Sequence, residues 1–248
     1  MSVPVTLERD GDVATITLAR PPLNVLDIAH LEELADSVEA AHSAGIIVLQ
    51  AGSGCRAFSA GNAVEDHVPE RAEQMLTTFH RAVYGLLGTD AITVADIAGD
   101  AFGGGCELIA ACDLAYTRPG THFGQPEIDV GCFPPVAVSL LPRRIGWTRA
   151  VELIALGERI DAETAADWGL ITRVSETGAA PYVGRLSEKS SAVLRATKRA
   201  LVEARRWPAS DGIAAAERVY RERLLPLADC EEGIRAFLDK RPPRWRGQ

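Results

Sequence analysis

Residues 101–116 read AFGGGCELIAACDLAY, and residues 123–131 read FGQPEIDVG. In the first stretch, three glycines lead from a predicted buried strand at residues 92–97 into a predicted apolar helix at residues 106–111. N–H groups at the start of a helix lack intrahelical acceptors, and the helix dipole adds partial positive charge there. The triple glycine therefore indicates a site for an anion, or for an oxyanion formed during a reaction. A plain tight turn between strand and helix is the alternative.

Two glutamates accompany these motifs. Glu107 falls in the first turn of the apolar helix, and Glu127 follows Pro126 in a mostly apolar neighbourhood. A carboxylate in a first helical turn also has a purely structural explanation, since the helix dipole favours it. Two glutamates that converge on one pocket could divide acid and base roles between them. The sequence alone does not show that they converge.

The surrounding pattern alternates between strands and helices. Residues 3–18 predict a β-hairpin with its turn at Asp10-Gly11-Asp12, and residues 27–44 have the apolar spacing of an amphipathic helix. The run IIVL at residues 46–49 is continuously apolar, which is typical of a strand covered on both faces. A helix over residues 70–87 and strands over residues 92–97 and 114–116 continue the rhythm. This alternation predicts an α/β fold with mainly parallel strand pairing.

The last part of the chain is different. From about residue 136 the pattern is almost wholly helical, and the basic, proline-containing residues 240–248 predict an extended surface tail. The predicted helices cover residues 136–141, 148–155, 162–168, 182–206, 213–225 and 230–239.

Composition excludes several classes of protein. The chain has 248 residues, 47% hydrophobic and 24% charged, so disordered, collagen-like and disulfide-framework proteins are ruled out. A net charge of −8 argues against a nucleic-acid partner. No apolar stretch is long enough to span a membrane, and the first residues do not resemble a secretion signal, so we expect a cytoplasmic protein without a membrane partner. The histidines and cysteines lack metal-ligand spacing, which predicts no metal site.

Together with AFSAG at residues 57–61, the two opening motifs resemble the enoyl-CoA hydratase/isomerase family, also called the crotonase superfamily. The resemblance extends from ARPPLNVLD at residues 19–27 to EEGIRAFLDKRPP at residues 231–243. It implies an α/β fold, a crotonase-like superhelix of ββα turns over residues 1–190. It also implies a helical C-terminal trimerisation region over residues 191–248, and assembly into a homotrimer or a hexamer.

The resemblance also assigns a site. It implies that the backbone N–H groups of Asn62 and Gly104 hold the oxyanion of an acyl-CoA thioester. Glu107 and Glu127 match the two glutamates of the family's hydratases, of which one activates water and the other delivers a proton to Cα. We do not assign the two roles individually. Coenzyme A enters as part of the substrate, so no separate cofactor is expected.

Coenzyme A carries several phosphate charges, and the resemblance implies which residues contact the substrate. Arg20 and Arg56 flank the segments that bind the nucleotide in this family, and Lys240 matches a tail that reaches a neighbour's ligand. A solvated surface charge is the alternative explanation for each cation. The residues expected to bind the substrate are Arg20, Arg56, Ala60, Gly61, Phe133, Pro134 and Lys240.

The sequence departs from the common family pattern in the acyl-binding segments. Asn62 stands where alanine is more common, and a glycine-rich turn after Glu127 is replaced by GCFPP at residues 131–135. Phe133 and Pro134 are therefore candidates for the pocket wall. FGQPEIxVGxFPP, with FSAGxxVxDHxPE at residues 58–70, is similar to cyclohexa-1,5-diene-1-carbonyl-CoA hydratases. His67 belongs to this stretch, although a surface histidine would fit it equally well.

The leading hypothesis is a lyase that adds water reversibly to an α,β-unsaturated acyl-CoA, including a cyclic dienoyl-CoA. An isomerase or dehydratase acting on a CoA-bound or carrier-protein-bound acyl chain is the enzymatic alternative. A catalytically silent paralogue that binds acyl-CoA is the non-enzymatic alternative.

Overall fold

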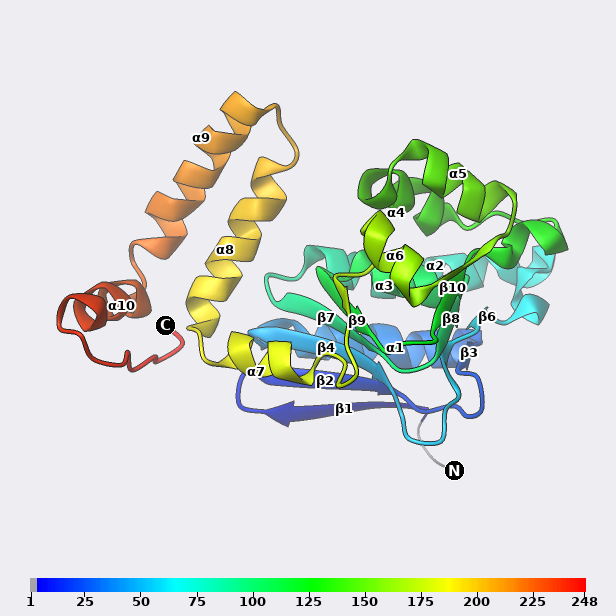
Figure 1. Ribbon diagram of the computed structural model, residues 1–248, viewed down its shortest axis with the longest axis horizontal. Helices are drawn as coiled ribbons and strands as arrows, with labels where there is room; N and C mark the ends of the chain where they lie inside the picture. Colours follow the sequence, from blue (N-terminus) through cyan, green and yellow to red (C-terminus); the bar gives the residue numbers. More distant parts are fainter. Residues whose placement is uncertain (1–3) are drawn as a thin grey trace.

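The computed structural model describes residues 4–248 and shows a mixed α/β body from which a helical arm extends (Figure 1). The predicted hairpin is present as two antiparallel strands, β1 (Val5–Asp10) and β2 (Val13–Leu18), with Gly11 at positive φ in the turn. Val3, the first residue of the predicted hairpin, lies outside the described residues. The expectation of an α/β fold with a helical C-terminal region is confirmed.

Six strands form the main sheet in the order β1-β2-β4-β7-β9-β12, and every pair after the hairpin is parallel. A second sheet has the order β11-β10-β8-β5, and β3 pairs with β6 in a parallel ribbon. The remaining strands are β3 (Val25–Leu26), β4 (Ile46–Ala51), β5 (Ala57–Ser59), β6 (Gly61–Asn62), β7 (Ile92–Ile97), β8 (Asp100–Phe102), β9 (Leu114–Thr117), β10 (His122–Gly124), β11 (Arg159–Asp161) and β12 (Arg173–Val174).

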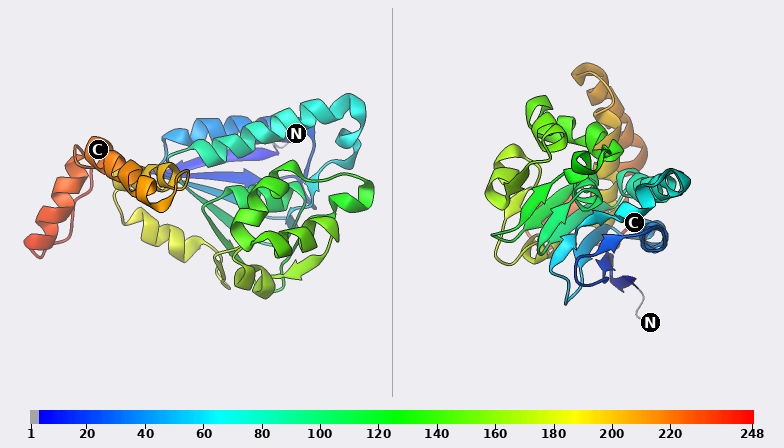
Figure 2. Two further views of the ribbon diagram at one scale, coloured as in Figure 1. Left: turned by 90° about the horizontal axis from the view of Figure 1, so that it is seen from above. Right: turned by 90° about the vertical axis from the view of Figure 1, so that its right-hand side faces the viewer.

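Both faces of the main sheet are covered, which explains the apolar run in β4. Ile47 and Leu49 point into the large core, whereas Ile46 and Val48 belong to a second cluster on the opposite face. The helices α1 (Ile28–Ala40) and α2 (Pro69–Gly88) lie side by side along the first face (Figure 2). Helix α7 (Ala180–Ser187) covers part of the second, where Tyr182 stacks on Tyr116 with ring centroids 4.1 Å apart.

Helix α3 (Gly104–Ala111) lies wholly inside the body, and all eight of its residues are buried. It begins at the middle glycine, two residues before the predicted start. The chain continues through the one-turn helix η3 (Pro126–Val130), then α4 (Pro135–Ile145), α5 (Trp147–Ala155) and α6 (Ala162–Trp168). Helix α3 packs against α2, α4 and β6.

The arm consists of α8 (Ser191–Ala204), α9 (Ala209–Val219), the π-helical turn η4 (Tyr220–Leu224) and α10 (Ala228–Leu238). The prediction of a single helix over residues 182–206 is wrong, because the chain forms two helices there, α7 and α8, with a break between them. Ser190 ends the break as the N-cap of α8, and its Oγ accepts a hydrogen bond from the N–H of Val193 (3.2 Å).

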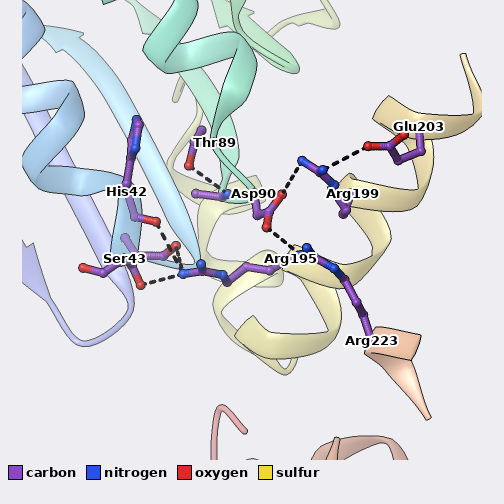
Figure 3. A network of polar contacts seen from close by, with 10 residues as sticks. His42, Ser43, Thr89, Asp90, Arg195, Arg199, Glu203 and Arg223 are labelled. Carbon is purple, nitrogen blue, oxygen red and sulfur yellow. Dashed lines mark hydrogen bonds and ion pairs between the residues drawn. The ribbon is translucent and has the colours of Figure 1, made fainter. Parts of the chain in front are cut away.

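Polar contacts fasten the arm to the body near the end of η1 (Ala41–Ser43), as Figure 3 shows. Nη1 of Arg195 donates to the carbonyl oxygens of His42 (3.4 Å) and Ser43 (2.9 Å). Asp90 pairs with Arg199 (3.9 Å) and Arg223 (3.4 Å), so one body carboxylate contacts two elements of the arm.

Beyond residue 241 the chain has no helix or strand, as the predicted tail requires, but it is held in place. The buried carboxylate of Asp229 accepts hydrogen bonds from the N–H groups of Arg246 (2.7 Å) and Gly247 (2.9 Å). Trp245 donates to the carbonyl oxygen of Glu188 (2.9 Å). Within residues 4–248, no helix is both long and apolar enough to cross a bilayer.

Candidate active site

The triple glycine forms a sharp corner between β8 and α3. Gly103 has φ +51° and ψ −126°, a conformation that glycine adopts far more readily than other residues, and its N–H donates to the carbonyl oxygen of Gly124 (3.0 Å). Gly104 opens α3, so its N–H has no intrahelical acceptor. Strand β6 runs close by, because a Cβ on Gly61 would lie 3.2 Å from the nitrogen of Gly104.

The second backbone N–H at this corner belongs to Asn62. The N–H of Ala63 donates to the carbonyl oxygen of Leu26 on β3 (2.9 Å), and successive N–H groups of a strand point to opposite sides. The N–H of Asn62 therefore points away from β3. The side chain of Asn62 lies over Gly104, where Oδ1 would be 2.5 Å from an added Cβ.

Glu107 is buried in the first turn of α3, with 2% of the residue exposed. Its Oε1 accepts a hydrogen bond from the N–H of Ala137, near the start of α4 (2.7 Å). Burial raises the pKa of the Glu107 carboxyl to about 8, against the opposing effect of that hydrogen bond. The negative charge on Glu127 contributes to this raised pKa.

Glu127 approaches the same corner from η3. Its Oε1 would lie 2.6 Å from a Cβ on Gly103, so the carboxylate fills the space that a side chain would need. The buried amide of Gln125, oriented with its nitrogen toward Glu127, donates to both carboxylate oxygens (3.1 and 3.2 Å). Burial raises the pKa of Glu127 to about 7.

Both glutamates line one cavity of about 280 Å³. The structure thus brings together residues that lie up to 73 positions apart, from Asn62 to Pro135. Of the residues predicted for the site, those that line the cavity are Asn62, Glu107, Glu127, Phe133 and Pro134. Two ionisable carboxyl groups on a mostly apolar cavity, beside two backbone N–H groups, can donate and accept protons next to a polarised carbonyl.

The residues predicted to contact coenzyme A lie outside this cavity. Arg20 forms an ion pair with Asp27 and donates to the carbonyl oxygen of Val25 (3.2 Å). The N–H of Arg56 donates to the carbonyl oxygen of Pro22 (2.7 Å), so the segments that carry the two arginines are packed together.

The other predicted contact residues occupy two different places. Ala60 and Gly61 precede Asn62, and the N–H of Ala60 donates to the carbonyl oxygen of Leu23 (2.9 Å). Lys240 is exposed beyond α10 on the arm, which extends away from the body of its own chain (Figure 1). Within one chain, Lys240 is therefore not brought to the cavity.

Several cavity residues were not predicted from the sequence. One apolar side of α2 forms part of the wall. The helical spacing of its apolar residues predicts that they are buried, but it does not indicate that they line a cavity. Gln125, which contacts Glu127 from outside the cavity lining, gave no signal beyond its place in the FGQPE motif. The remaining unpredicted lining residues are Ala72, Met75, Leu76, Phe79, Gly131, Cys132 and Pro135, together with His67. No group of three or more potential metal ligands occurs within residues 4–248.

The family model for enoyl-CoA hydratase/isomerase matches residues 8–248. This chain belongs to that family. Two curated hydratases from Thauera aromatica are similar to this family member along almost the whole length of both chains. Cyclohexa-1,5-dienecarbonyl-CoA hydratase is 32% identical over 98% of this chain and 96% of its own. (E)-benzylidenesuccinyl-CoA hydratase is 31% identical over 99% of this chain and 100% of its own.

Solved structures of similar chains agree with the fold. DspI from Pseudomonas aeruginosa has a TM-score of 0.89 and 30% identity, covering 99% of this chain and 97% of that one. An enoyl-CoA hydratase from Bacillus anthracis has a TM-score of 0.92 and 26% identity, covering 99% of this chain and 100% of that one. The relatives support enoyl-CoA hydratase/isomerase-type activity on an acyl-CoA for this chain.

Proposed function

We propose that this protein adds water reversibly across the conjugated double bond of a compact α,β-unsaturated acyl-CoA. The observation that carries the proposal is the placement of Glu107 and Glu127 on one cavity, beside the start of α3. Isomerisation needs only one group to move a proton between carbons, whereas hydration needs a base for water and an acid for Cα. Two carboxyl groups on one cavity meet that requirement.

The proposed reaction begins with polarisation of the thioester carbonyl. Its oxygen accepts hydrogen bonds from the backbone N–H groups of Asn62 and Gly104, which draws electron density away from Cβ. The ionised glutamate takes a proton from water as the water oxygen bonds to Cβ, and the π electrons move to form an enolate. The protonated glutamate then gives its proton to Cα. The sum is one water molecule added, with one C–O bond and one C–H bond formed.

The electrostatics of the pair suit this division of roles. Burial raises the pKa values of Glu107 and Glu127 to about 8 and about 7, so the two carboxyl groups need not both be ionised near neutral pH. The negative charge on Glu127 also raises the pKa of Glu107, which disfavours ionisation of both groups at once. We assign the acid and base roles to the pair jointly.

The acyl group that we propose is short or cyclic. The cavity holds about 280 Å³ and is walled by apolar side chains from α2 and by Phe133, Pro134 and Pro135. Cyclohexa-1,5-diene-1-carbonyl-CoA is the specific candidate, supported by the similarity to the Thauera hydratase that is named for that substrate. We propose that Arg20 and Arg56 contact the phosphates of coenzyme A, and that Lys240 does so from a neighbouring copy in a homotrimer or hexamer.

The test compares crotonyl-CoA with cyclohexa-1,5-diene-1-carbonyl-CoA by loss of the enoyl-thioester absorbance. We expect Glu107→Gln and Glu127→Gln each to lower kcat by about two orders of magnitude or more. The exposed Glu176→Gln is the control and should keep wild-type turnover. A higher kcat/KM for cyclohexa-1,5-diene-1-carbonyl-CoA would support it as the substrate. A higher kcat/KM for crotonyl-CoA would overturn that choice and indicate a hydratase of short linear chains.

The alternatives give different results in the same experiment. An isomerase would move the double bond without incorporating oxygen from labelled water, which mass spectrometry of the product would detect. A silent acyl-CoA-binding paralogue would turn over no substrate, and its affinity for the acyl-CoA would be the same with either glutamine variant. Either result would overturn the proposal of a hydratase.

A further inference from the structure

The segment between β6 and α2 places two polar side chains on the acyl cavity, and neither has its hydrogen bonds completed by the described residues. Asn62 and His67 both line the cavity. Oδ1 of Asn62 is buried without a hydrogen-bond partner. Among the described residues, the hydrogen-bond acceptor for Nδ2 of Asn62 is Sδ of Met75 (3.4 Å), and a thioether sulfur is a weak acceptor. Buried polar groups are normally paired, so the unpaired Oδ1 of Asn62, beside the half-buried His67, points to a ligand that donates a hydrogen bond.

His67 presents a defined hydrogen-bonding group. Its Nδ1 lies 2.9 Å from the carbonyl oxygen of Ala63. Because a carbonyl oxygen can only accept, Nδ1 carries the proton, and in the neutral ring Nε2 is then an acceptor. Among the residues that the structure describes, Nε2 has no hydrogen-bond partner.

The turn that carries His67 is anchored on both sides. His67 ends the 3-10 turn η2 (Val64–His67). The preceding residue, Asp66, is buried, and its carboxylate accepts from the N–H of Ile28 (3.0 Å) and pairs with Arg71 (2.9 Å). These contacts tie the turn to the first residues of both α1 and α2. The imidazole is therefore held at the cavity wall by the fold.

The rest of this wall is apolar, with Ala72, Leu76 and Phe79 from α2. A purely hydrocarbon acyl group would displace water from the amide and the imidazole and leave them unpaired. A hydroxyl group supplies the missing donor, because Oδ1 of Asn62 and Nε2 of His67 both accept and a hydroxyl hydrogen can bond to either. A carbonyl oxygen cannot donate to Nε2, and a carboxylate would need a protonated imidazole.

We propose that His67 and Asn62 recognise a hydroxyl group on the acyl chain or ring, beyond the carbons that react. The inference rests on the proposed function, since it takes the cavity to be the acyl site. Within the proposed substrate class, it favours compact acyl-CoAs that bear a hydroxyl group, including hydroxylated forms of the cyclic dienoyl-CoA, over their unsubstituted parents. The hydroxyl does not take part in the reaction, and the two side chains set specificity.

The test measures binding of saturated analogues by calorimetry, so it does not depend on turnover. Butyryl-CoA is compared with 4-hydroxybutyryl-CoA, and cyclohexanecarbonyl-CoA with its 3-hydroxy and 4-hydroxy derivatives. We expect the wild-type protein to bind at least one hydroxylated ligand about tenfold or more tightly than its parent. His67→Leu and Asn62→Ala should bring that ratio near one, whereas His67→Gln, which keeps an acceptor, should retain part of it.

The exposed His122→Leu is the matched control and should keep the wild-type ratio. Circular dichroism of each variant confirms folding before its ratio is interpreted. Equal affinity of the wild-type protein within every pair, or a preference that survives His67→Leu, would overturn the inference. Failure of the proposed function is separate: it would appear as absence of hydration, whatever the ligand ratios are.

Discussion

A Cβ atom on Gly103 would lie 2.6 Å from Oε1 of Glu127 and 3.3 Å from its Cδ. The corner before α3 and the carboxylate of η3 thus share one space, and Glu127 reaches its position because residue 103 has no side chain. The same residue has φ +51°, so glycine is needed there for two independent reasons. This relationship links the backbone turn that presents the Gly104 N–H to the placement of a glutamate.

Gly103→Ala should therefore impair both stability and activity. The methyl group would force the backbone or the Glu127 carboxylate to move, and the conformation itself is strained for alanine. We expect a loss of about 1–3 kcal/mol in the free energy of unfolding and a fall in kcat of at least about tenfold. Denaturant titration and enoyl-CoA hydration assays measure these. Gly88→Ala, where an added Cβ meets no atom within 4 Å, should change neither.

The buried carboxyl of Glu107 should make stability depend on pH. Burial raises its pKa from 4.5 to about 8, so between these values the folded protein binds more protons than the unfolded chain. The free energy of unfolding must then decrease as pH rises through that window. Glu107→Gln removes this titration while its amide oxygen can still accept from Ala137. We expect the variant to gain stability relative to wild type between pH 5 and pH 8.

Urea denaturation at pH 5, 6.5 and 8 measures this effect. The stability difference between Glu107→Gln and wild type should grow by at least about 1 kcal/mol across the series. Glu176→Gln, at an exposed position, should show a difference independent of pH. A flat difference for Glu107→Gln would show that the carboxyl titrates as it does in the unfolded chain.

Met75 lies on the cavity wall with 1% of the residue exposed, so its size should limit the acyl group. Met75→Ala should cost about 2–5 kcal/mol of unfolding free energy because it leaves a cavity. It should also shift kcat/KM toward longer acyl chains, measured with enoyl-CoA substrates of four to ten carbons. Met75→Leu conserves volume and should keep the wild-type chain-length profile at a cost below about 1.5 kcal/mol. Unchanged chain-length selectivity in Met75→Ala would exclude this wall from the acyl site.

Asp229 should control whether residues 240–248 stay attached to the arm. Its carboxylate accepts from Ser190 Oγ (2.6 Å) and from the N–H groups of Arg246 and Gly247. Asp229→Ala leaves these donors without an acceptor, and we expect a loss of about 1–3 kcal/mol. Hydrogen exchange at the amides of residues 246 and 247 should become faster. Asp167→Asn, at an exposed site on α6, is the control and should leave that exchange unchanged.

Local sequence patterns predicted most of the secondary structure. The strand over residues 92–97 and the helix over residues 162–168 have the predicted bounds, because their apolar periodicity is strong and their neighbours agree with it. The predicted helix over residues 182–206 failed because one serine N-cap outweighed a continuous helical pattern. Short strands such as β10 and β11 were missed, since three residues carry too little periodicity to be recognised.

For the candidate site, too, some features could be predicted from the sequence and others depend on the fold. The residue types in GGGCE and GQPE, and their order along the chain, come from the sequence, and so does the family they resemble. Whether Glu107 and Glu127 converge was open at that stage, and the answer depends on how η3 and α3 pack. The raised pKa values of both carboxyl groups come from burial in the folded chain, which no local pattern reports.

His67 shows most clearly what a local sequence pattern cannot predict. In the sequence it is a lone histidine in a polar segment, equally consistent with a solvated surface loop. Its place on the cavity follows from Asp66, whose carboxylate joins the turn to α1, 38 residues away in the sequence, and to α2. The sequence determined the elements and the chemical groups, because those depend on residues a few positions apart. The tertiary structure decided which groups share a cavity and with what ionisation, because proximity and burial arise only when distant segments pack together.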